Sequence, residues 1–405
     1  MRPDTIDVKT AQPRDSASGS ATIRDQEGHV AARFSKYSPV AATIGTAPRR
    51  RAPKEDQTMR YNPALDGLRA IAVVMVVAFH TNVPFVRGGM IGVDIFFVIS
   101  GYLITGILRS ELVKTGSIDL RDFYARRLWR LMPALVLAMA GTYLFYRIVR
   151  PYTNINGDII AALLYYADYR IALAHFPTTI KHTWSLAVEM QFYLVWPLFL
   201  LATRRMDDRA LLRLLLVLFV TATIWRCLNV MALSDWNRSY YSFDTRLSGL
   251  LLGAALAISG WQQRTSATTA DRIGAGALLL LTILCISLQW KHTPSLTTGV
   301  LLAELAGLAL IMGLWVERSI AAKALSAPWL VYVGKLSYAI YLWHYGLAVV
   351  LRHELPPALS FPITLVAATT LSALSFHYVE TPCLAWSRRR KTDRDGANKA
   401  VISPP

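Results

Sequence analysis

Long apolar stretches, separated by short polar and basic connections, dominate the chain from residue 68 onward. Ten of them are long enough to cross a hydrocarbon layer of about 30 Å as helices. We predict spans near 68–86, 91–108, 131–149, 184–203, 214–233, 243–260, 273–290, 297–316, 331–351 and 361–382. The pattern therefore predicts an all-α integral membrane protein with about ten transmembrane helices.

One further apolar segment, 157–174, carries Asp158, Asp168 and Arg170, which are costly groups if they face lipid. Ten spans with both termini in the cytoplasm place most of the 43 Lys and Arg residues on the cytoplasmic side. An eleventh crossing at this segment would divide them almost evenly. We therefore predict that 157–174 is an external interfacial or re-entrant segment whose polar backbone is covered by protein or water.

The ends of the chain differ in composition from its middle. Residues 1–58 are polar and have no sustained apolar period, which predicts a disordered cytoplasmic tail. Met59 stands just ahead of the first apolar run, so we hypothesise that translation starts there. Residues 59–387 are expected to form the membrane domain, and 388–405 a basic, polar C-terminal tail.

Composition and charge support a membrane protein and argue against other classes. Hydrophobic residues make up 54% of the chain and charged residues only 17%, against about 25% charged in soluble domains. Basic residues beside apolar runs record membrane orientation, so the net charge of +17 does not predict nucleic-acid binding. The three widely spaced cysteines, Cys227, Cys285 and Cys383, predict neither a disulfide framework nor a metal site.

The first span contains two ionisable residues, Arg69 and His80. Eleven residues of helix turn through about three full turns and rise about 16 Å, so both side chains share one face at different depths. Ionisable groups inside a membrane helix indicate function by default. A snorkelling arginine and an ordinary core histidine would explain either residue alone, but a shared face favours a functional pair.

Five more acids and imidazoles are expected at the depth of His80, in the outer half of the membrane: Asp94, Glu189, Asp244, Glu304 and His344. A neutral imidazole accepts a proton from a hydroxyl group, and a carboxylate fixes its tautomer. Such a cluster could supply a general base and the carboxylate that orients it, and Asp94 is placed where it could reach the level of His80. The alternative is that these groups form interhelical hydrogen bonds that hold the helices together.

The cytoplasmic end of the third span is basic, with Arg126, Arg127 and Arg130 ahead of Pro133. These residues fit the ordinary bias of cytoplasmic ends toward positive charge. Together with Arg69 they also suit a polyphosphate, because guanidinium groups bind phosphate oxygens in a forked geometry. A phosphorylated donor inside and an acid–base cluster outside suggest a group that is transferred across the membrane.

These motifs resemble the membrane-bound acyltransferase-3 family, whose members O-acylate bacterial surface glycans and some secondary metabolites. The resemblance covers about residues 60–387. The family signature of a basic residue, ten residues and a histidine matches Arg69 and His80. Further matches are 65–70, 92–102, the arginines before Pro133, Trp184 with Ser185, Leu186, Glu189 and 191–193, Ser337 with Tyr338 and 341–344, and Glu380 with Pro382.

The resemblance implies an O-acyltransferase that moves an acyl group, most simply acetyl, from cytosolic acyl-CoA to a hydroxyl of a cell-surface glycan, lipopolysaccharide or exopolysaccharide precursor. It implies a multi-pass protein of the cell inner membrane with no bound cofactor and no metal; acyl-CoA is a substrate. The expected catalytic residues are His80, Asp94 and Glu189. The expected donor-binding residues are Arg69, Arg126, Arg127 and Arg130. The expected supporting residues are Trp184, Asp244, Arg246, Ser337, Tyr338 and His344.

Two departures from the family pattern limit this expectation. Met190 stands where many members have an acid, and only about 20 polar residues follow the last span, too few for the hydrolase-like domain of some members. We therefore expect the membrane domain, or a separate extracytoplasmic partner, to recognise the acceptor.

Several alternatives stay open. A transporter or flippase of a lipid-linked sugar would also use intramembrane charges, although no pair of broken helices in two halves is evident. A scaffold that binds lipid through the basic tails is a third reading. Within the enzyme class, the reaction could be succinyl transfer or macrolide acylation.

Overall fold

The computed structural model describes residues 61–389, apart from 175–178, 234, 262–265 and 317–318. The predicted tail at 1–58 and residues 390–405 lie outside this part of the chain. The described residues belong to one compact unit and contain no β-strand. The labelled α-helices of this part are α1 Pro63–His80, α2 Gly92–Thr115, α3 Leu120–Val149, α4 Asn156–Leu163, α5 Ala167–Ala174, α6 Trp184–Ala202, α7 Asp208–Leu233, α8 Trp236–Tyr241, α9 Phe243–Ile258, α10 Ala267–Ser287, α11 Val300–Leu314, α12 Ile320–Leu325, α13 Pro328–Glu354 and α14 Pro357–Ser375. Residues 376–389 continue the last of these as helix.

Eight helical segments within the described residues are long and apolar enough to cross a membrane. They are 63–80, 89–115, 120–149, 181–202, 208–232, 267–287, 295–314 and 357–389. The other two predicted spans are also helices, but α9 has only 16 residues and α13 carries Lys335, His344 and Arg352 within its 27 residues. The all-α integral membrane fold is confirmed, and the sidedness of the helices stays a prediction.

Helix α1 begins and ends earlier than the predicted span 68–86. The Asn62 side chain accepts a hydrogen bond from the backbone N–H of Ala64 at 3.0 Å, and Pro63 occupies the first turn, where a missing N–H costs nothing. The helix ends at His80, and Asn82 adopts a left-handed conformation with φ of 59°. His80 is thus the last residue of a helix, next to a turn, rather than a residue inside a longer span.

The segment 157–174 does not form a spanning helix. It folds into α4 and α5, eight residues each, which are too short to cross a membrane. Its charged groups find protein partners: the Arg170 Nε atom lies 3.1 Å from Asp158 Oδ1, and Gln191 Nε2 lies 3.0 Å from both oxygens of Asp168. The ion pair and the hydrogen bonds therefore offset the free energy of removing these groups from water.

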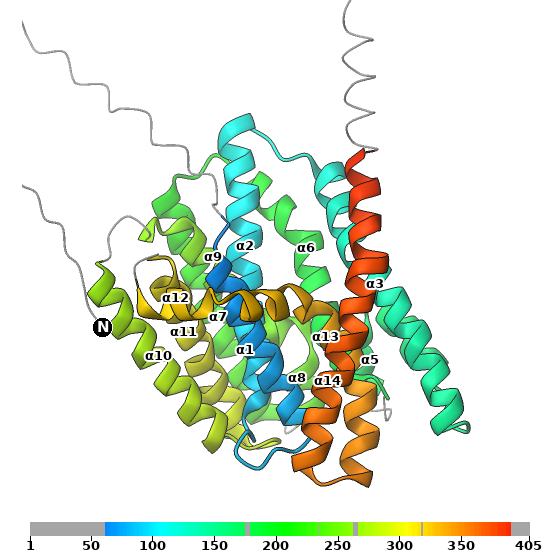
Figure 1. Cartoon of the computed structure of the whole chain (residues 1–405). Coiled ribbons are helices and arrows are strands. Elements are labelled where there is room, and N and C mark those ends of the chain that lie inside the picture. The colour runs from blue at the N-terminus through cyan, green and yellow to red at the C-terminus, as the bar shows by residue number, and fades with distance from the viewer. Residues whose placement is uncertain (1–60, 175–178, 234, 262–265, 317–318, 390–405) are drawn as a thin grey trace, which may run out of the picture. The chain divides into compact units, whose positions relative to one another are not determined.

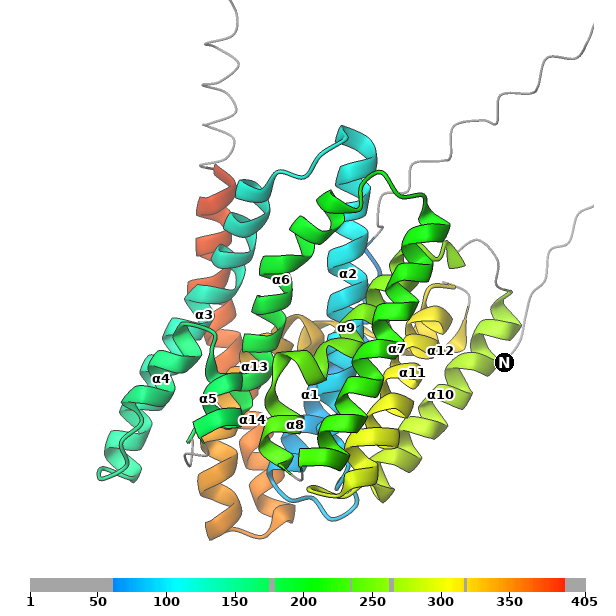
Figure 2. The same ribbon diagram turned by 180° about the vertical axis from the view of Figure 1, so that it is seen from behind.

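Helix α1 lies near the middle of the helices, with α10 and α3 toward opposite sides (Figures 1 and 2). Its most extensive partner is α13, and α2 packs most extensively on α9. Glycines allow these close approaches: a Cβ atom at Gly334 of α13 would overlap the Asp66 carbonyl, and one at Gly253 of α9 would overlap the Val98 carbonyl. Small residues at such crossings let membrane helices pack backbone to backbone.

Candidate active site

A pair of histidines lies where α1 ends beside α13. His80 Nδ1 lies 3.0 Å from His344 Nε2, and His344 is fully buried. On its other side, His344 Nδ1 lies 2.7 Å from the Tyr341 carbonyl oxygen and 3.2 Å from that of Ile340. Two residues that are 264 positions apart in the sequence are thus joined by a direct hydrogen bond.

The backbone carbonyls assign the protons of this pair. A carbonyl oxygen only accepts, so His344 Nδ1 must carry a proton, and in the neutral ring His344 Nε2 is then an acceptor. His80 Nδ1 therefore donates to it. The lone pair of neutral His80 is left on Nε2, which is the arrangement that a general base requires.

A cavity adjoins His80, and we call it the His80 cavity. Helices α1, α6, α8 and α13 and the connections beside them supply its polar and aromatic lining. These lining residues are Phe79, His80, Asn82, Lys181, His182, Trp184, Tyr240, Tyr241, Trp290, Tyr341, Tyr345 and Arg352. An aromatic and largely apolar wall with a few polar groups is typical of a site that binds a small molecule or a sugar.

His182 is a second imidazole in this cavity. Its Nε2 atom lies 3.2 Å from the Leu342 carbonyl oxygen and therefore donates, whereas its buried Nδ1 atom has no hydrogen-bond partner. Its ring stacks on Tyr345 with centroids 4.7 Å apart, and Tyr345 meets the His80 ring edge-on at 4.9 Å. Two imidazole rings thus line one cavity.

Asp94 does not contact His80. Its Oδ1 atom lies 2.6 Å from Arg246 Nη2, and both side chains are buried. The Arg246 guanidinium also lies over the rings of Tyr240 and Trp184, at 4.8 and 5.3 Å. The partner that orients His80 is therefore His344, while Asp94 and Arg246 hold two aromatic walls of the His80 cavity.

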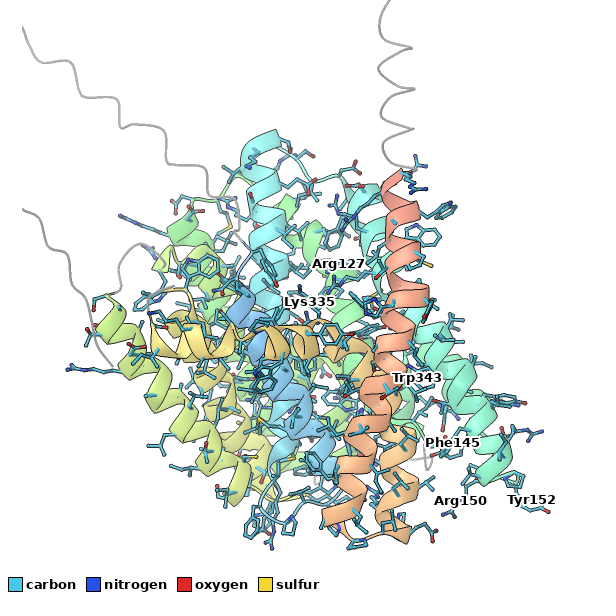
Figure 3. The ribbon with its side chains drawn as sticks, viewed as in Figure 1. Arg127, Phe145, Arg150, Tyr152, Lys335 and Trp343 are labelled. Atoms are coloured by element: carbon cyan, nitrogen blue, oxygen red, sulfur yellow. The ribbon has the colours of Figure 1, made fainter. Side chains whose placement is uncertain are left out.

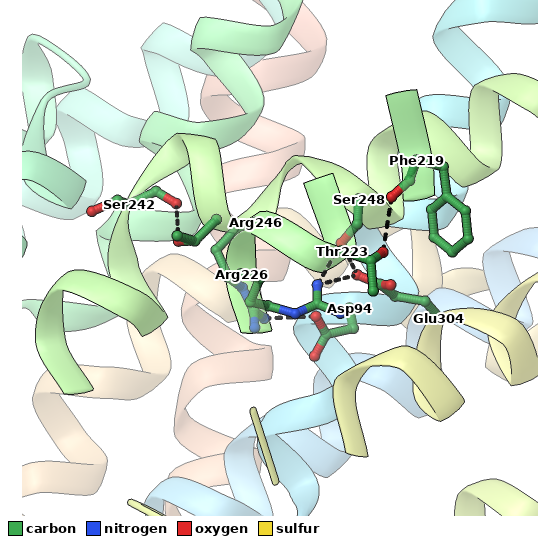
Figure 4. Close-up of polar contacts among 9 residues, drawn as sticks. Asp94, Phe219, Thr223, Arg226, Ser242, Arg246, Ser248 and Glu304 are labelled. Carbon is green, nitrogen blue, oxygen red and sulfur yellow. Dashed lines mark hydrogen bonds and ion pairs between the residues drawn. The ribbon is translucent and has the colours of Figure 1, made fainter. Parts of the chain in front are cut away.

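A second buried ion pair lies near the first (Figure 4). Arg226 Nη1 of α7 lies 3.1 Å from Glu304 Oε1 of α11, and Ser248 of α9 hydrogen-bonds both partners. These residues join three helices and do not line the His80 cavity. Their arrangement matches the interhelical hydrogen bonding that the sequence left open for Glu304.

Three of the four predicted donor-binding arginines line another cavity, which we call the arginine cavity. Arg69, Arg127 and Arg130 lie on its wall with Glu189, Tyr193, Ser337 and Tyr338. The fourth, Arg126, lies outside it and pairs with Asp122 and, at 3.8 Å, with Glu111. The cavity therefore gathers three guanidinium groups from two helices, α1 and α3.

Glu189 belongs to the arginine cavity rather than to the histidines. Its Oε1 atom accepts a hydrogen bond from Ser100 at 2.7 Å. Asp244 lies in neither cavity; it pairs with both terminal nitrogens of Arg238 and accepts a hydrogen bond from Trp225. Glu189 and Asp244 were expected at the depth of His80, but neither contacts it.

The two cavities meet at Val93 and Tyr341, which line both. The Tyr341 hydroxyl lies 2.7 Å from the His182 carbonyl oxygen, to which it donates, and 2.7 Å from Ser185 Oγ. Figure 3 shows Arg127 in the upper half of the view and Arg150 near its lower edge. Arg127 lines the arginine cavity, and His80 lies some 16 Å along α1 from Arg69.

Three residues of the site were not among the predicted site residues: His182, Tyr345 and Tyr341, although Tyr341 belongs to the matched motif at 341–344. His182 stands two positions before the predicted Trp184, and Tyr341 stands three before His344, where a helix brings residues onto one face. That proximity was the available signal. The stacking of Tyr345 on His182 joins two segments far apart in the chain, so no local pattern announces it.

The fold and the site define a multi-helix membrane protein with a hydrogen-bonded pair of imidazoles and a guanidinium-lined cavity. A family model described as an acyltransferase domain matches residues 62–377. The chain therefore belongs to this family, the membrane-bound acyltransferase-3 proteins that its motifs resemble.

Curated relatives are similar over most of the chain. The peptidoglycan O-acetyltransferase OatA of Listeria monocytogenes is 35% identical over 347 residues, which cover 80% of this chain and 56% of the relative. The O-acetyltransferase OatA of Staphylococcus aureus is 35% identical over 353 residues, which cover 80% of this chain and 57% of the relative. The chain thus spans just over half the length of these relatives. No solved structure matches it.

Proposed function

We propose that this protein is a membrane-embedded O-acetyltransferase that transfers an acetyl group from cytosolic acetyl-CoA to a hydroxyl group of a cell-surface glycan. The observation that carries the proposal is the His80–His344 pair, which leaves a basic nitrogen beside a cavity that meets the arginine cavity. The family and the named activity of the relatives support the same reaction class.

In this proposal the arginine cavity receives the donor. Arg69, Arg127 and Arg130 bind phosphates of coenzyme A, because guanidinium groups hold phosphate oxygens through charge-assisted hydrogen bonds. The thioester then extends toward Tyr341, where the two cavities meet. This arrangement separates the anionic part of the donor from the reacting carbon.

The His80 cavity receives the acceptor. His80 Nε2 takes the proton of the acceptor hydroxyl, the oxygen attacks the thioester carbonyl carbon, and the carbon–sulfur bond breaks. The proton held by His80 passes to the departing sulfur, so the products are an acetyl ester and free coenzyme A. His344 accepts from His80 Nδ1 throughout and keeps the reacting nitrogen in place.

The same residues serve a route with an acetyl-enzyme intermediate. Transfer from coenzyme A to a side chain and transfer from that side chain to the acceptor would each use His80 as the base. The proposed setting is the inner membrane, with the arginine cavity open toward the cytoplasm and the His80 cavity toward the outside. The proposed acceptor class is a peptidoglycan-like or other surface polysaccharide, in line with the printed name of the Listeria relative.

Labelled acetyl-CoA supplied to membranes that carry the wild type or His80→Ala at matched expression tests this proposal. We expect label in the saccharide fraction with the wild type and a loss of at least about 100-fold with His80→Ala, since general-base catalysis contributes about 10²–10⁴-fold. His182→Ala serves as a comparison, because it removes an imidazole from the same cavity but leaves the His80–His344 pair intact. Equal transfer by wild type and His80→Ala would contradict the proposal.

A transporter predicts a different result. Acetyl transfer to a soluble saccharide in detergent needs no gradient, so it supports the enzyme and excludes a protein that only moves its substrate across a membrane.

A further inference from the structure

A third cavity opens beside the His80 cavity and carries an excess of positive charge; we call it the basic vestibule. Its lining is Tyr146, Arg150, Thr153, Thr179, Lys181, Tyr345, Val349, Val350, Arg352 and His353. Its lining residues include three basic side chains, Arg150, Lys181 and Arg352, and no carboxylate. Nothing in the acyl transfer step described above uses these cations.

The basic vestibule adjoins the His80 cavity. Lys181, Tyr345 and Arg352 line both. Arg352 Nη1 lies 3.4 Å from the backbone oxygen of His80, and the Tyr345 ring meets the His80 ring edge-on. A molecule held by Lys181 and Arg352 would therefore have its neighbouring groups against Tyr345 and within reach of His80.

The carboxylates nearest to these cations are already engaged. Glu354 pairs with Arg150 at 3.8 Å. Asp158 pairs with Arg170 and accepts hydrogen bonds from the Thr179 backbone N–H and hydroxyl. Lys181 makes no ion pair with any described residue, and the buried Arg352 Nε atom has no hydrogen-bond partner. Of the vestibule cations, Lys181 and Arg352 thus have no carboxylate partner among the described residues.

We infer that the basic vestibule binds an anionic group of the acceptor, a carboxylate or a phosphate carried by the saccharide close to the hydroxyl that is acylated. This inference rests on the proposed function and names the acceptor class more closely. Aromatic rings favour the apolar faces of sugars, and cations beside them favour an acidic substituent, so Tyr345 with Lys181 and Arg352 fits an acidic saccharide. A neutral glycan would leave the two cations without an anionic partner.

Equilibrium binding tests this inference without any turnover. The protein is placed in zwitterionic phosphatidylcholine nanodiscs, and binding is measured by thermophoresis for three labelled probes. The probes are a neutral N-acetylglucosamine tetramer, a carboxylated form of it, and its 1-phosphate. The two acidic probes distinguish a sugar carboxylate from a phosphate of the kind that a lipid-linked sugar carries.

We expect at least one acidic probe to bind the wild type roughly tenfold more tightly than the neutral tetramer, as for one charge-assisted contact. Lys181→Gln should remove most of this advantage, and Lys181→Arg should restore it. Arg147→Gln is the matched control, since Arg147 is an exposed cation one turn before Arg150 on α3 and does not line the vestibule. It should leave all three dissociation constants unchanged.

Equal binding of neutral and acidic probes by the wild type would overturn the inference, and so would no binding of any probe. An advantage that persists unchanged in folded Lys181→Gln would overturn it as well. Loss of the advantage in nanodiscs with anionic lipid, but not in neutral ones at the same ionic strength, would assign the vestibule to a lipid headgroup instead. Because no donor is present, these outcomes are independent of the label-transfer test of the proposed function.

Discussion

His80 Nδ1 and His344 Nε2 lie 3.0 Å apart, at the meeting of the first helix of the membrane domain and its thirteenth. Because His344 donates through Nδ1 to the Tyr341 carbonyl, the direction of the hydrogen bond between the two histidines is determined: His80 donates and His344 accepts. His344 takes the place that a carboxylate has in the more familiar histidine–carboxylate pair. A neutral imidazole in that place orients His80 without burying a charge beside it.

The role of His344 as an acceptor leads to a graded mutational series. We expect His344→Ala to lower the acetyl-transfer rate by about 10- to 100-fold, because His80 then loses its fixed tautomer. His344→Gln should retain more activity than His344→Ala, since its amide oxygen can accept from His80 Nδ1. Initial rates in nanodiscs measure this, with the KM for acetyl-CoA expected to stay constant in both variants. Equal loss in the two variants would indicate a packing role instead.

The arginine cavity leads to a prediction about the donor. Arg127→Gln and Arg130→Gln should each raise the KM for acetyl-CoA by about tenfold, the loss expected for one charge-assisted contact with phosphate. The neighbouring Arg126→Gln is the control, because Arg126 points to Asp122 and Glu111 and lies outside the cavity. A similar rise of KM in Arg126→Gln would show that general positive charge, and not the cavity, attracts the donor.

The buried pair of Asp94 and Arg246 leads to a prediction about stability. Asp94→Asn leaves the Arg246 guanidinium without its counter-charge, so we expect it to destabilise the protein by about 3–5 kcal/mol. The double variant Asp94→Leu with Arg246→Met removes both charges and should be considerably more stable than Asp94→Asn. Thermal unfolding in detergent compares them. A double variant as unstable as the single one would mean that the ring contacts of Arg246 matter more than its charge balance.

Asp168 in α5, outside the eight spanning candidates, leads to a prediction about pH. Burial raises the pKa of Asp168 to about 6, although Gln191 donates to its carboxylate. Since the pKa in the folded state lies above the ordinary value, folding favours the protonated acid, and stability falls as pH rises from about 4 to 6. Asp168→Asn keeps an acceptor for Gln191 and does not titrate. We therefore expect the two proteins to have similar Tm at pH 4 and the variant to be more stable above pH 6; a constant difference in Tm across this range would contradict the assignment.

Much of the fold follows from the sequence, because a membrane helix needs a long apolar run and this requirement is visible in the residues. All ten predicted spans are helices, and the shared face of Arg69 and His80 holds because it depends only on helix geometry. The end of the first span was predicted too late because the chain turns at Asn82, while the apolar sequence continues through 83–86.

The partners of the site residues could not be predicted in the same way. The order of the spans indicates the depth of a side chain, but not the direction in which its helix faces its neighbours. Asp94 and His344 were both expected at the depth of His80, yet packing turns His344 toward it and Asp94 toward Arg246. Glu189 likewise lies on a helix that lines both cavities, and its position along that helix assigns it to the arginines.

The tautomer of His80 tests the account most directly. Nitrogen-15 NMR of histidine-labelled protein in nanodiscs distinguishes protonated from bare ring nitrogens, and His80→Ala and His344→Ala assign the signals. We predict that in neutral His80 the Nδ1 atom carries the proton and Nε2 is bare, and that His344 is also protonated at Nδ1. A proton on Nε2 of neutral His80 would contradict the account. That nitrogen could then not take the proton of the saccharide hydroxyl.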